Sequence, residues 1–237
     1  MTSPPWLTLP ERKGVQTPAL QEFLASNAQD FSKAWDRCEQ AHHLVELAIA
    51  GRLPVETILG ACVKVSQNAW KEWTSGATDA RPPQVLHGVD TWLRRESGFD
   101  DIWASWELAE ALLKEVELWY QQQQGTVVAS AVFNAVKSVH TLVSVARNLA
   151  CPEEGHRHHN PGRYAQKNAD PERASLLHKA AEAVHEATKA GSWHHSGSTP
   201  GASQEDHERY AHQQVGFLLR QHLDASQVVR ALEGALG

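Results

Sequence analysis

The sequence predicts an all-α protein without a β-sheet. Apolar residues recur at helical spacing through most of the 237 residues, and no segment alternates apolar with polar residues. Gly or Pro stands where helices should begin and end. The punctuated segments number roughly eight to nine helices. Their periodicity fits either a multi-helix bundle or an irregular α-solenoid and does not choose between them.

The first long helices follow an N-terminal arm, residues 1–29, which holds a short helix near Thr17-Pro18. We expect one helix to begin at Asp30, which can cap it, and to end at Gly51. The next should begin at Pro54 and end before Gly76. These two helices should pair as an antiparallel hairpin.

Three more helices complete the predicted core over residues 30–150. Amphipathic segments run from Pro82 to about Glu96 and from Ile102 to Tyr120. The segment from Thr126 to Ala150 is apolar on most of its circumference, and such a helix is normally surrounded by others. We therefore expect it to lie at the centre of the molecule.

The C-terminal part, residues 171–237, should hold the remaining helices. Residues 151–170 are a predicted loop, and so are residues 191–204, which read GSWHHSGSTPGASQ. One helix should occupy residues 171–190, and two more should follow near residues 205–223 and 224–236. All of them are expected to join a single domain over residues 1–237.

The composition excludes several classes of function. The formal net charge is −6 with a pI near 6.1, which disfavours nucleic-acid binding and suits a basic protein partner. Cys38, Cys62 and Cys151 are odd in number and form no CxxC pair, so a reducing cytoplasm is expected. The opening MTSPPWLTLPERKG lacks the apolar core of a signal peptide, and no later apolar run is expected to span a bilayer.

The stretch CPEEGHRHHNPGRY is rich in potential metal ligands. Cys151, His156, His158 and His159 could together supply thiolate and imidazole groups to zinc. Their spacing matches no established zinc pattern, so a polar surface loop is the preferred interpretation.

Two Glu-x-x-His pairs, Glu39 with His42 and Glu182 with His185, would each share a helix face. Di-iron bundles use two such pairs together with glutamates from two other helices, which this chain is poorly arranged to supply. No sequence fingerprint of a nucleotide-binding, hydrolase or zinc-protease site is present. We therefore predict no metal, no cofactor and no catalysis, and keep a metal-binding helical-bundle enzyme or sensor as an alternative.

The nine tryptophans point to a candidate contact surface. Trp103 and Trp106 are one turn apart, and Asp100, Asp101 and Glu107 flank them. Aromatic residues are enriched at the energetic centres of protein interfaces, so these five residues are predicted to bind a partner.

Several segments resemble a family of bacterial immunity proteins. The segments are AWDRCEQAHHLVELA, GRLPVETILGACVKVSQNAW and DARPPQVLHGVDTWLR, with a weaker similarity in QQVGFLLRQHL. The family carries W-x-x-C, then D-x-R-P-x-x-A-I and a Trp. The matching residues here are Trp35, Cys38, Asp79, Arg81, Pro82 and Trp92. Val85-Leu86 replaces the family's Ala-Ile.

The resemblance covers roughly residues 30–150 and implies an all-helical, non-catalytic antidote that binds and neutralises a cognate toxin or effector protein. Pro82 should fix the start of a helix, Asp79 should cap it, and Arg81 should brace the preceding turn. An inhibitor or regulator of a self-encoded partner, such as a protease, is the alternative that the sequence does not separate from this function. The partner's identity and the oligomeric state are not predicted.

Overall fold

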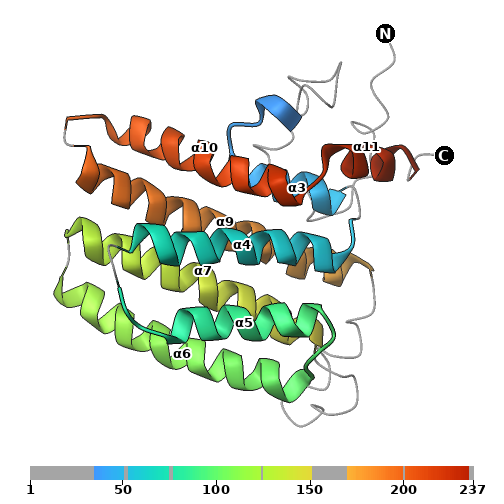
Figure 1. Cartoon of the computed structure of the whole chain (residues 1–237), viewed down its shortest axis with the longest axis horizontal. Helices are drawn as coiled ribbons and strands as arrows, with labels where there is room; N and C mark the ends of the chain where they lie inside the picture. The colour runs from blue at the N-terminus through green and yellow to red at the C-terminus, as the bar shows by residue number, and fades with distance from the viewer. Residues whose placement is uncertain are drawn as a thin grey trace.

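The computed structural model describes residues 35–50, 53–74, 77–123, 125–150, 170–199 and 201–234, and these form helices and connections without a strand. The all-α prediction is therefore confirmed. The helices are α3 (Ala41–Ala50), α4 (Val55–Trp73), α5 (Arg81–Leu93), α6 (Phe99–Gln122), α7 (Val127–Ala150), α9 (Asp170–Ser198), α10 (Gln204–His222) and α11 (Ala225–Gly234) (Figure 1).

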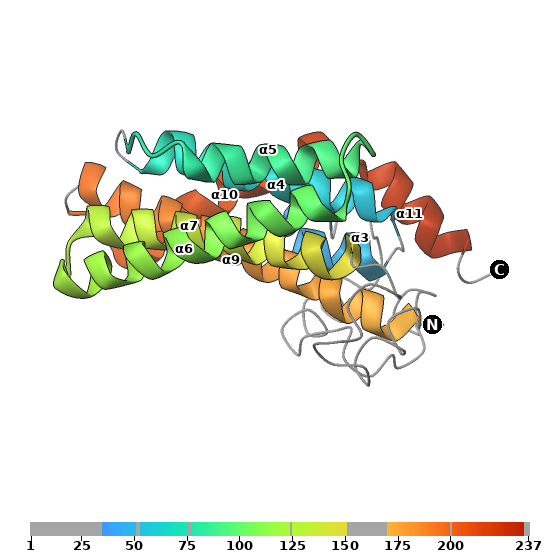
Figure 2. The same ribbon diagram turned by 90° about the horizontal axis from the view of Figure 1, so that it is seen from below.

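The helices form a bundle in which α4, α7 and α9 are central. Helices α3 and α10 lie along one edge and α5 and α6 along the other, with the central three between them (Figures 1 and 2). Helix α4 packs against α5, α7, α9 and α10, and α9 packs against α3, α4, α7 and α10. In a solenoid each unit would contact only its neighbours along the chain, so these contacts identify a bundle.

Helix α7 confirms the prediction of a central helix. Its buried residues include Val139, Leu142 and Val143, which belong to a single hydrophobic cluster with residues of the surrounding helices. Among the described residues, α7 is the one helix long and apolar enough to span a membrane, contrary to the expectation that no segment would be. Other parts of the molecule bury 61% of its most apolar 18-residue window, as a core helix requires.

The first predicted helix is wrong in its detail. Within its described part, residues 35–37 are helical, residues 38–40 are not, and α3 begins at Ala41. The break coincides with a contact distant in sequence, because the Arg220 guanidinium of α10 donates to the carbonyl oxygens of Trp35 (2.8 Å) and Cys38 (2.9 Å). The predicted hairpin is wrong too, since α3 packs mainly on α9 and α10 rather than on α4. Residues 1–34 lie outside the described residues.

The predicted loop over residues 191–204 is wrong over most of its length, because α9 continues to Ser198. Gly191 lies against Trp73 of α4, where an added Cβ would be 3.0 Å from the indole ring. Ser192 is 3% exposed. Close packing on α4 therefore selects small residues at positions where sequence propensity alone indicates a loop.

Backbone and side-chain hydrogen bonds cap the start of α10 and the end of α5. Ser203 accepts a hydrogen bond from the backbone N–H of Asp206 at the start of α10, and the Asp206 carboxylate reaches back in a capping box. At the end of α5, Arg95 has φ 61°, the left-handed conformation that glycine usually supplies. The N–H groups of Arg95 and Glu96 bond the carbonyls of Trp92 and Thr91.

Candidate functional site

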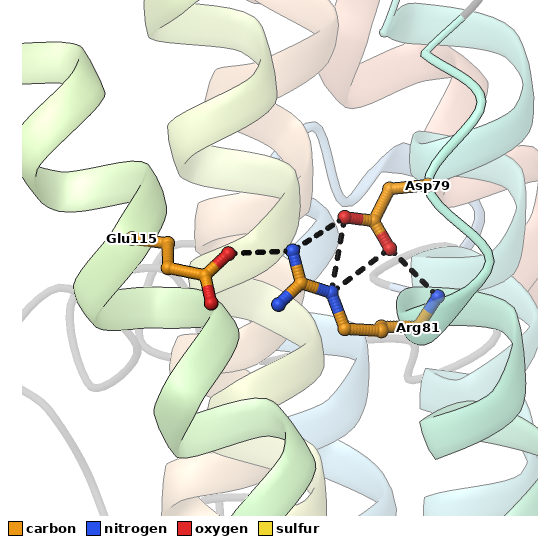
Figure 3. Close-up of polar contacts among 3 residues, drawn as sticks. All are labelled: Asp79, Arg81 and Glu115. Atoms are coloured by element: carbon orange, nitrogen blue, oxygen red, sulfur yellow. Dashed lines mark hydrogen bonds and ion pairs between the residues drawn. The ribbon is translucent and has the colours of Figure 1, made fainter.

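An ion-pair network ties the start of α5 to α6 (Figure 3). Asp79 accepts hydrogen bonds from the backbone N–H of Arg81 (2.8 Å) and from Nε and Nη2 of its guanidinium (3.0 Å and 2.7 Å). The same guanidinium bonds the Glu115 carboxylate of α6 at 2.7 Å. Hydrogen bonds from Arg81 hold the pKa of Asp79 and that of Glu115 below their usual values. Asp79 therefore accepts the first N–H of α5, although the N-cap residue is Ala80, and Arg81 ties back to Asp79. Glu115 is a partner that the sequence did not reveal.

The other residues of the immunity-type motif are also architectural. Trp35 is 2% exposed and Cys38 is 5% exposed. Pro82 is buried in the first turn of α5, and Trp92 is partly buried against the core. Burial raises the pKa of the Cys38 thiol to about 11, and the pKa of the Cys62 thiol to about 12. Neither thiol is a ready nucleophile at neutral pH.

Helix α6 carries most of the net charge of the chain. It holds six acidic residues and one lysine, a net charge of −5, whereas the whole chain has −6. It packs on α5 and α7 and leaves its outer side uncovered by the described residues. We call this side the α6 face; its exposed charged and large apolar residues are Asp100, Asp101, Glu107, Lys114, Glu115, Glu117, Leu118 and Trp119.

The five predicted partner-binding residues lie together near the beginning of the helix. The indole N–H of Trp103 donates to Glu107 (3.0 Å), and Asp101 accepts the N–H of Gly98 (3.0 Å). Arg147 of α7 lies over the Trp106 ring, with its guanidinium carbon 3.9 Å from the ring centroid. Both indoles are half-buried and pack against neighbouring side chains, so they protrude little from the α6 face.

The most exposed apolar part of α6 lies at its other end. Leu118 is 62% exposed and Trp119 37% exposed, and across the turn Val128 of α7 is 48% exposed. The sequence analysis missed these three residues. The signal of Leu118 is positional, because it falls outside the helical stripe of Ile102, Ala109 and Leu112 that α6 buries. Trp119, seven residues after Leu112, continues that stripe and carries no such signal.

A second concentration of chemistry lies where α3, α9 and α10 meet. We call it the histidine junction; it comprises His42 and His43 of α3, His185 of α9 and His212 of α10. From the His42 ring centroid the other three lie 4.4 Å (His43), 5.2 Å (His185) and 6.0 Å (His212) away. The fold thus unites His42 and His185 of the two Glu-x-x-His pairs and adds His43 and His212, which the sequence analysis did not select.

The hydrogen bonds of the junction are incomplete. His212 Nδ1 accepts the backbone N–H of Ala41 at 3.2 Å, so in the neutral ring the proton is on Nε2. The Nδ1 atoms of His42 and His185 are buried without a partner. Burial lowers the pKa of all four histidines, that of His42 to about 3 and that of His212 to about 4. The rings are therefore neutral at pH 7.

The junction does not assemble a metal site. Among the described residues, no three His, Cys, Asp or Glu side chains are placed to share a metal ion. Moreover, a neutral imidazole that accepts at Nδ1 has a proton rather than a lone pair at Nε2, which leaves His212 without a free ligand atom. Cys151, His156, His158 and His159 lie outside the described residues.

Beside the junction, α9 and α10 line a pocket of about 270 Å³ that includes His185, Ser192, Trp193, Glu208 and His212. The Gln204 amide already bonds the Ser192 hydroxyl (3.1 Å) and the Glu208 carboxylate (3.2 Å) across it. Polar groups that line the pocket thus form hydrogen bonds with one another. No nucleophile with an adjacent base is formed there by the described residues.

Comparison with known protein families, curated proteins and solved structures finds no match to this chain. The resemblance to immunity proteins consequently stays a prediction.

Proposed function

We propose that this protein acts by binding a basic protein through the α6 face, as a non-catalytic antidote that neutralises a toxin or effector. The observation that carries the proposal is the concentration of charge on one outer helix, whose net charge of −5 accompanies exposed Leu118 and Trp119. Complementary charge increases association rate and selects partners, while exposed apolar side chains supply the buried centre of an interface.

The internal bonds of α6 support this role. Glu115 is held by Arg81, the Glu110 carboxylate accepts a hydrogen bond from Nε2 of His140 on α7 at 2.8 Å, and Asp101 caps the helix. These contacts fix the helix on the bundle before any partner arrives, so that little conformational entropy is lost on binding. The exposed side chains of Glu117 and Leu118 are thus carried by a helix whose position is already fixed.

The test is a capture experiment with matched surfaces. Tagged wild-type chain is compared with the double variant Glu117→Lys/Leu118→Ser and with the control Glu205→Lys/Phe217→Ser on α10. The control matches the charge change and the apolar exposure, since Phe217 is 61% exposed and Leu118 62%. A true partner is retained by wild type and control and lost by the α6 variant.

The purified partner then defines the function. Its affinity should fall at least about tenfold with the α6 variant and should weaken as NaCl rises, because salt screens charge attraction. Expression of the partner alone should stop growth, and co-expression of wild-type chain should restore it. Equal binding by the α6 variant would refute the interface; a harmless partner whose activity the chain blocks would instead indicate a regulator of a self-encoded enzyme.

A further inference from the structure

We infer that the histidine junction is an acid-sensitive latch, in which proton uptake releases α3 from α9 and α10. The inference is independent of the α6 face and of any partner. It rests on how the three helices are joined: four imidazoles meet in one place, one of them forms the interhelical hydrogen bond, and two others bury nitrogen atoms without partners.

The bond between Ala41 and His212 is the part that a proton breaks most directly. The backbone N–H of Ala41, at the start of α3, donates to Nδ1 of His212 on α10. Protonated Nδ1 carries its own hydrogen and can no longer accept. Two N–H groups would then point at each other across the helix contact. Proton uptake therefore removes the tie and puts repulsion in its place.

His42 makes the same site intolerant of charge. Its ring is next to those of His43, His185 and His212, and edge-to-face packing of its ring on His43 and His185 is favourable for neutral aromatic groups. A proton on any of the four rings places a cation among imidazoles in a buried setting. The ring nitrogens of His42 and His185 that already lack partners offer no compensating bond.

The charged groups around the junction do not reverse this balance. Helix α9 contributes Glu186, which favours the His185 cation, and Lys189, which opposes it; α10 contributes Glu208, which favours it, and α7 contributes Lys137, which opposes it. His178 and Glu182 lie on α9, and Glu46 of α3 is 3.9 Å from His178. Burial outweighs all of these charges, and among the described residues neither α4 nor α11 supplies one that shifts these histidines.

The size of the expected effect follows from linkage. Once exposed, a histidine has its ordinary pKa near 6.5, whereas the closed junction holds the pKa of His42 at about 3 and that of His212 at about 4. The open state binds more protons, so acid favours opening. One proton taken up on opening raises the opening constant about thirtyfold between pH 7.5 and pH 5.0. Charging one ring opposes charging the next, so we expect one such step.

Opening would expose apolar surface that is hidden at neutral pH. Leu44 and Leu47 of α3 and Val215 and Leu219 of α10 are all buried, and they belong to the main hydrophobic cluster. Release of α3 would uncover these side chains while α6 and α7, which pack mainly on other helices, keep their contacts. The latch thus links acidity to exposure of a defined face.

The experiment measures amide hydrogen exchange of α3 and α10 at pH 7.5 and pH 5.0, corrected for the intrinsic effect of pH on exchange. The test variant is His42→Gln/His212→Gln, because a glutamine carbonyl can still accept the Ala41 N–H but cannot take up a proton. His87→Gln on α5 is the control, since His87 is exposed. We expect an opening constant of α3 about thirtyfold larger at pH 5.0 than at pH 7.5 in wild type and control, and a clearly smaller increase in the double variant, in which only His43 and His185 remain to take up a proton.

An equal acceleration in the double variant would overturn the inference, and so would unchanged opening in the wild type. A titration of the wild-type histidine ring signals by NMR decides the question if the double variant does not fold. The latch requires the His42 and His212 signals of the folded chain to stay those of neutral rings at pH 5.5. Ordinary titration near pH 6.5 with α3 still protected would contradict it.

Discussion

The α6 face and the histidine junction both contain several ionisable side chains. Those of the α6 face are exposed to water, whereas those of the histidine junction are largely buried. On α6 the carboxylates are exposed or paired with Arg81, His140 and Lys114. In the junction the imidazoles are largely buried, and two nitrogen atoms have no partner. The first arrangement keeps its charge over a wide range of pH, whereas the second is stable only while it remains uncharged.

The difference shows what each region is suited to do. A charged, supported helix can recognise a partner without changing shape, and hydrogen bonds lower the pKa of Glu110 and that of Glu115, which keeps these two carboxylates ionised well below neutral pH. A buried neutral cluster recognises nothing from inside the bundle. It can instead make the packing of α3 depend on acidity.

The largest expected effect comes from the inner side of α6. Leu112 is 1% exposed, and Leu112→Ala should lower the free energy of unfolding by about 3 kcal/mol through lost burial and a cavity. Because no titratable group is involved, the loss should be the same at pH 7.5 and pH 5.0. Urea denaturation at both pH values checks this. A loss that changed with pH would contradict the distinction between a pH-independent α6 and a pH-dependent histidine junction.

A change beside the junction, where α10 contacts the segment before α3, should be next in size. The Arg220 guanidinium bonds the carbonyls of Trp35, Asp36 and Cys38, so Arg220→Met should cost about 2 kcal/mol by leaving acceptors without a partner. Hydrogen exchange should show the loss in α3 and α10 first. Gly216→Ala is a milder companion, because its Cβ would be 2.9 Å from Arg220 Nη1 and would displace the side chain. Uniform destabilisation of every helix would argue against a separate junction.

The tie between α5 and α6 should contribute less. Arg81→Met should reduce stability by at most about 1 kcal/mol, because Arg81 and Asp79 are partly exposed and water screens them. Arg81 lowers the pKa of Asp79, so this contribution is present above the ordinary pKa of 3.8 and is lost as pH falls through the lowered value. Thermal unfolding should therefore show the same small difference at pH 7.5 and pH 5.0. A difference that vanished at pH 5.0 would contradict the assigned pairing.

The smallest effect should be a gain. Arg95 has a left-handed backbone at the end of α5, and Arg95→Gly should raise stability by about 0.5 kcal/mol by relieving that strain. The gain should be equal at both pH values because the site lies outside the junction. Unfolding measurements on Arg95→Ala serve as the control, since alanine keeps the strain. A gain with alanine as large as with glycine would assign the effect to the side chain instead.

The sequence predicts where helices lie along the chain better than it predicts which helices pack against each other. Helix α7 is recognisable because apolar residues occupy most of its circumference. Pro82 in the first turn of α5 and the N-cap Ser203 of α10 mark helix starts through residues next to each other in the chain. The extension of α9 to Ser198 was missed because Gly191 is selected by Trp73, a contact distant in sequence. The break before α3 was missed for a similar reason, since Arg220 imposes it from α10.

The candidate sites show the same division. Asp79 and Arg81 interact over two residues, so their pairing could be predicted, whereas Glu115 could not. His42 and His185 were selected for spacing, but only the packing of α9 and α10 brings His212 to them. Local sequence records the turn or the helix face; which faces meet depends on packing of the whole bundle.

The most direct measurement is a helix-by-helix map of hydrogen exchange in the wild-type chain at pH 7.5 and pH 5.0. The account predicts that α3 and the part of α10 around His212 lose protection at pH 5.0, while α6 and α7 keep theirs. Equal loss in all helices, or full protection of α3 at pH 5.0, would contradict the separation of a charge-tolerant face from a charge-intolerant junction.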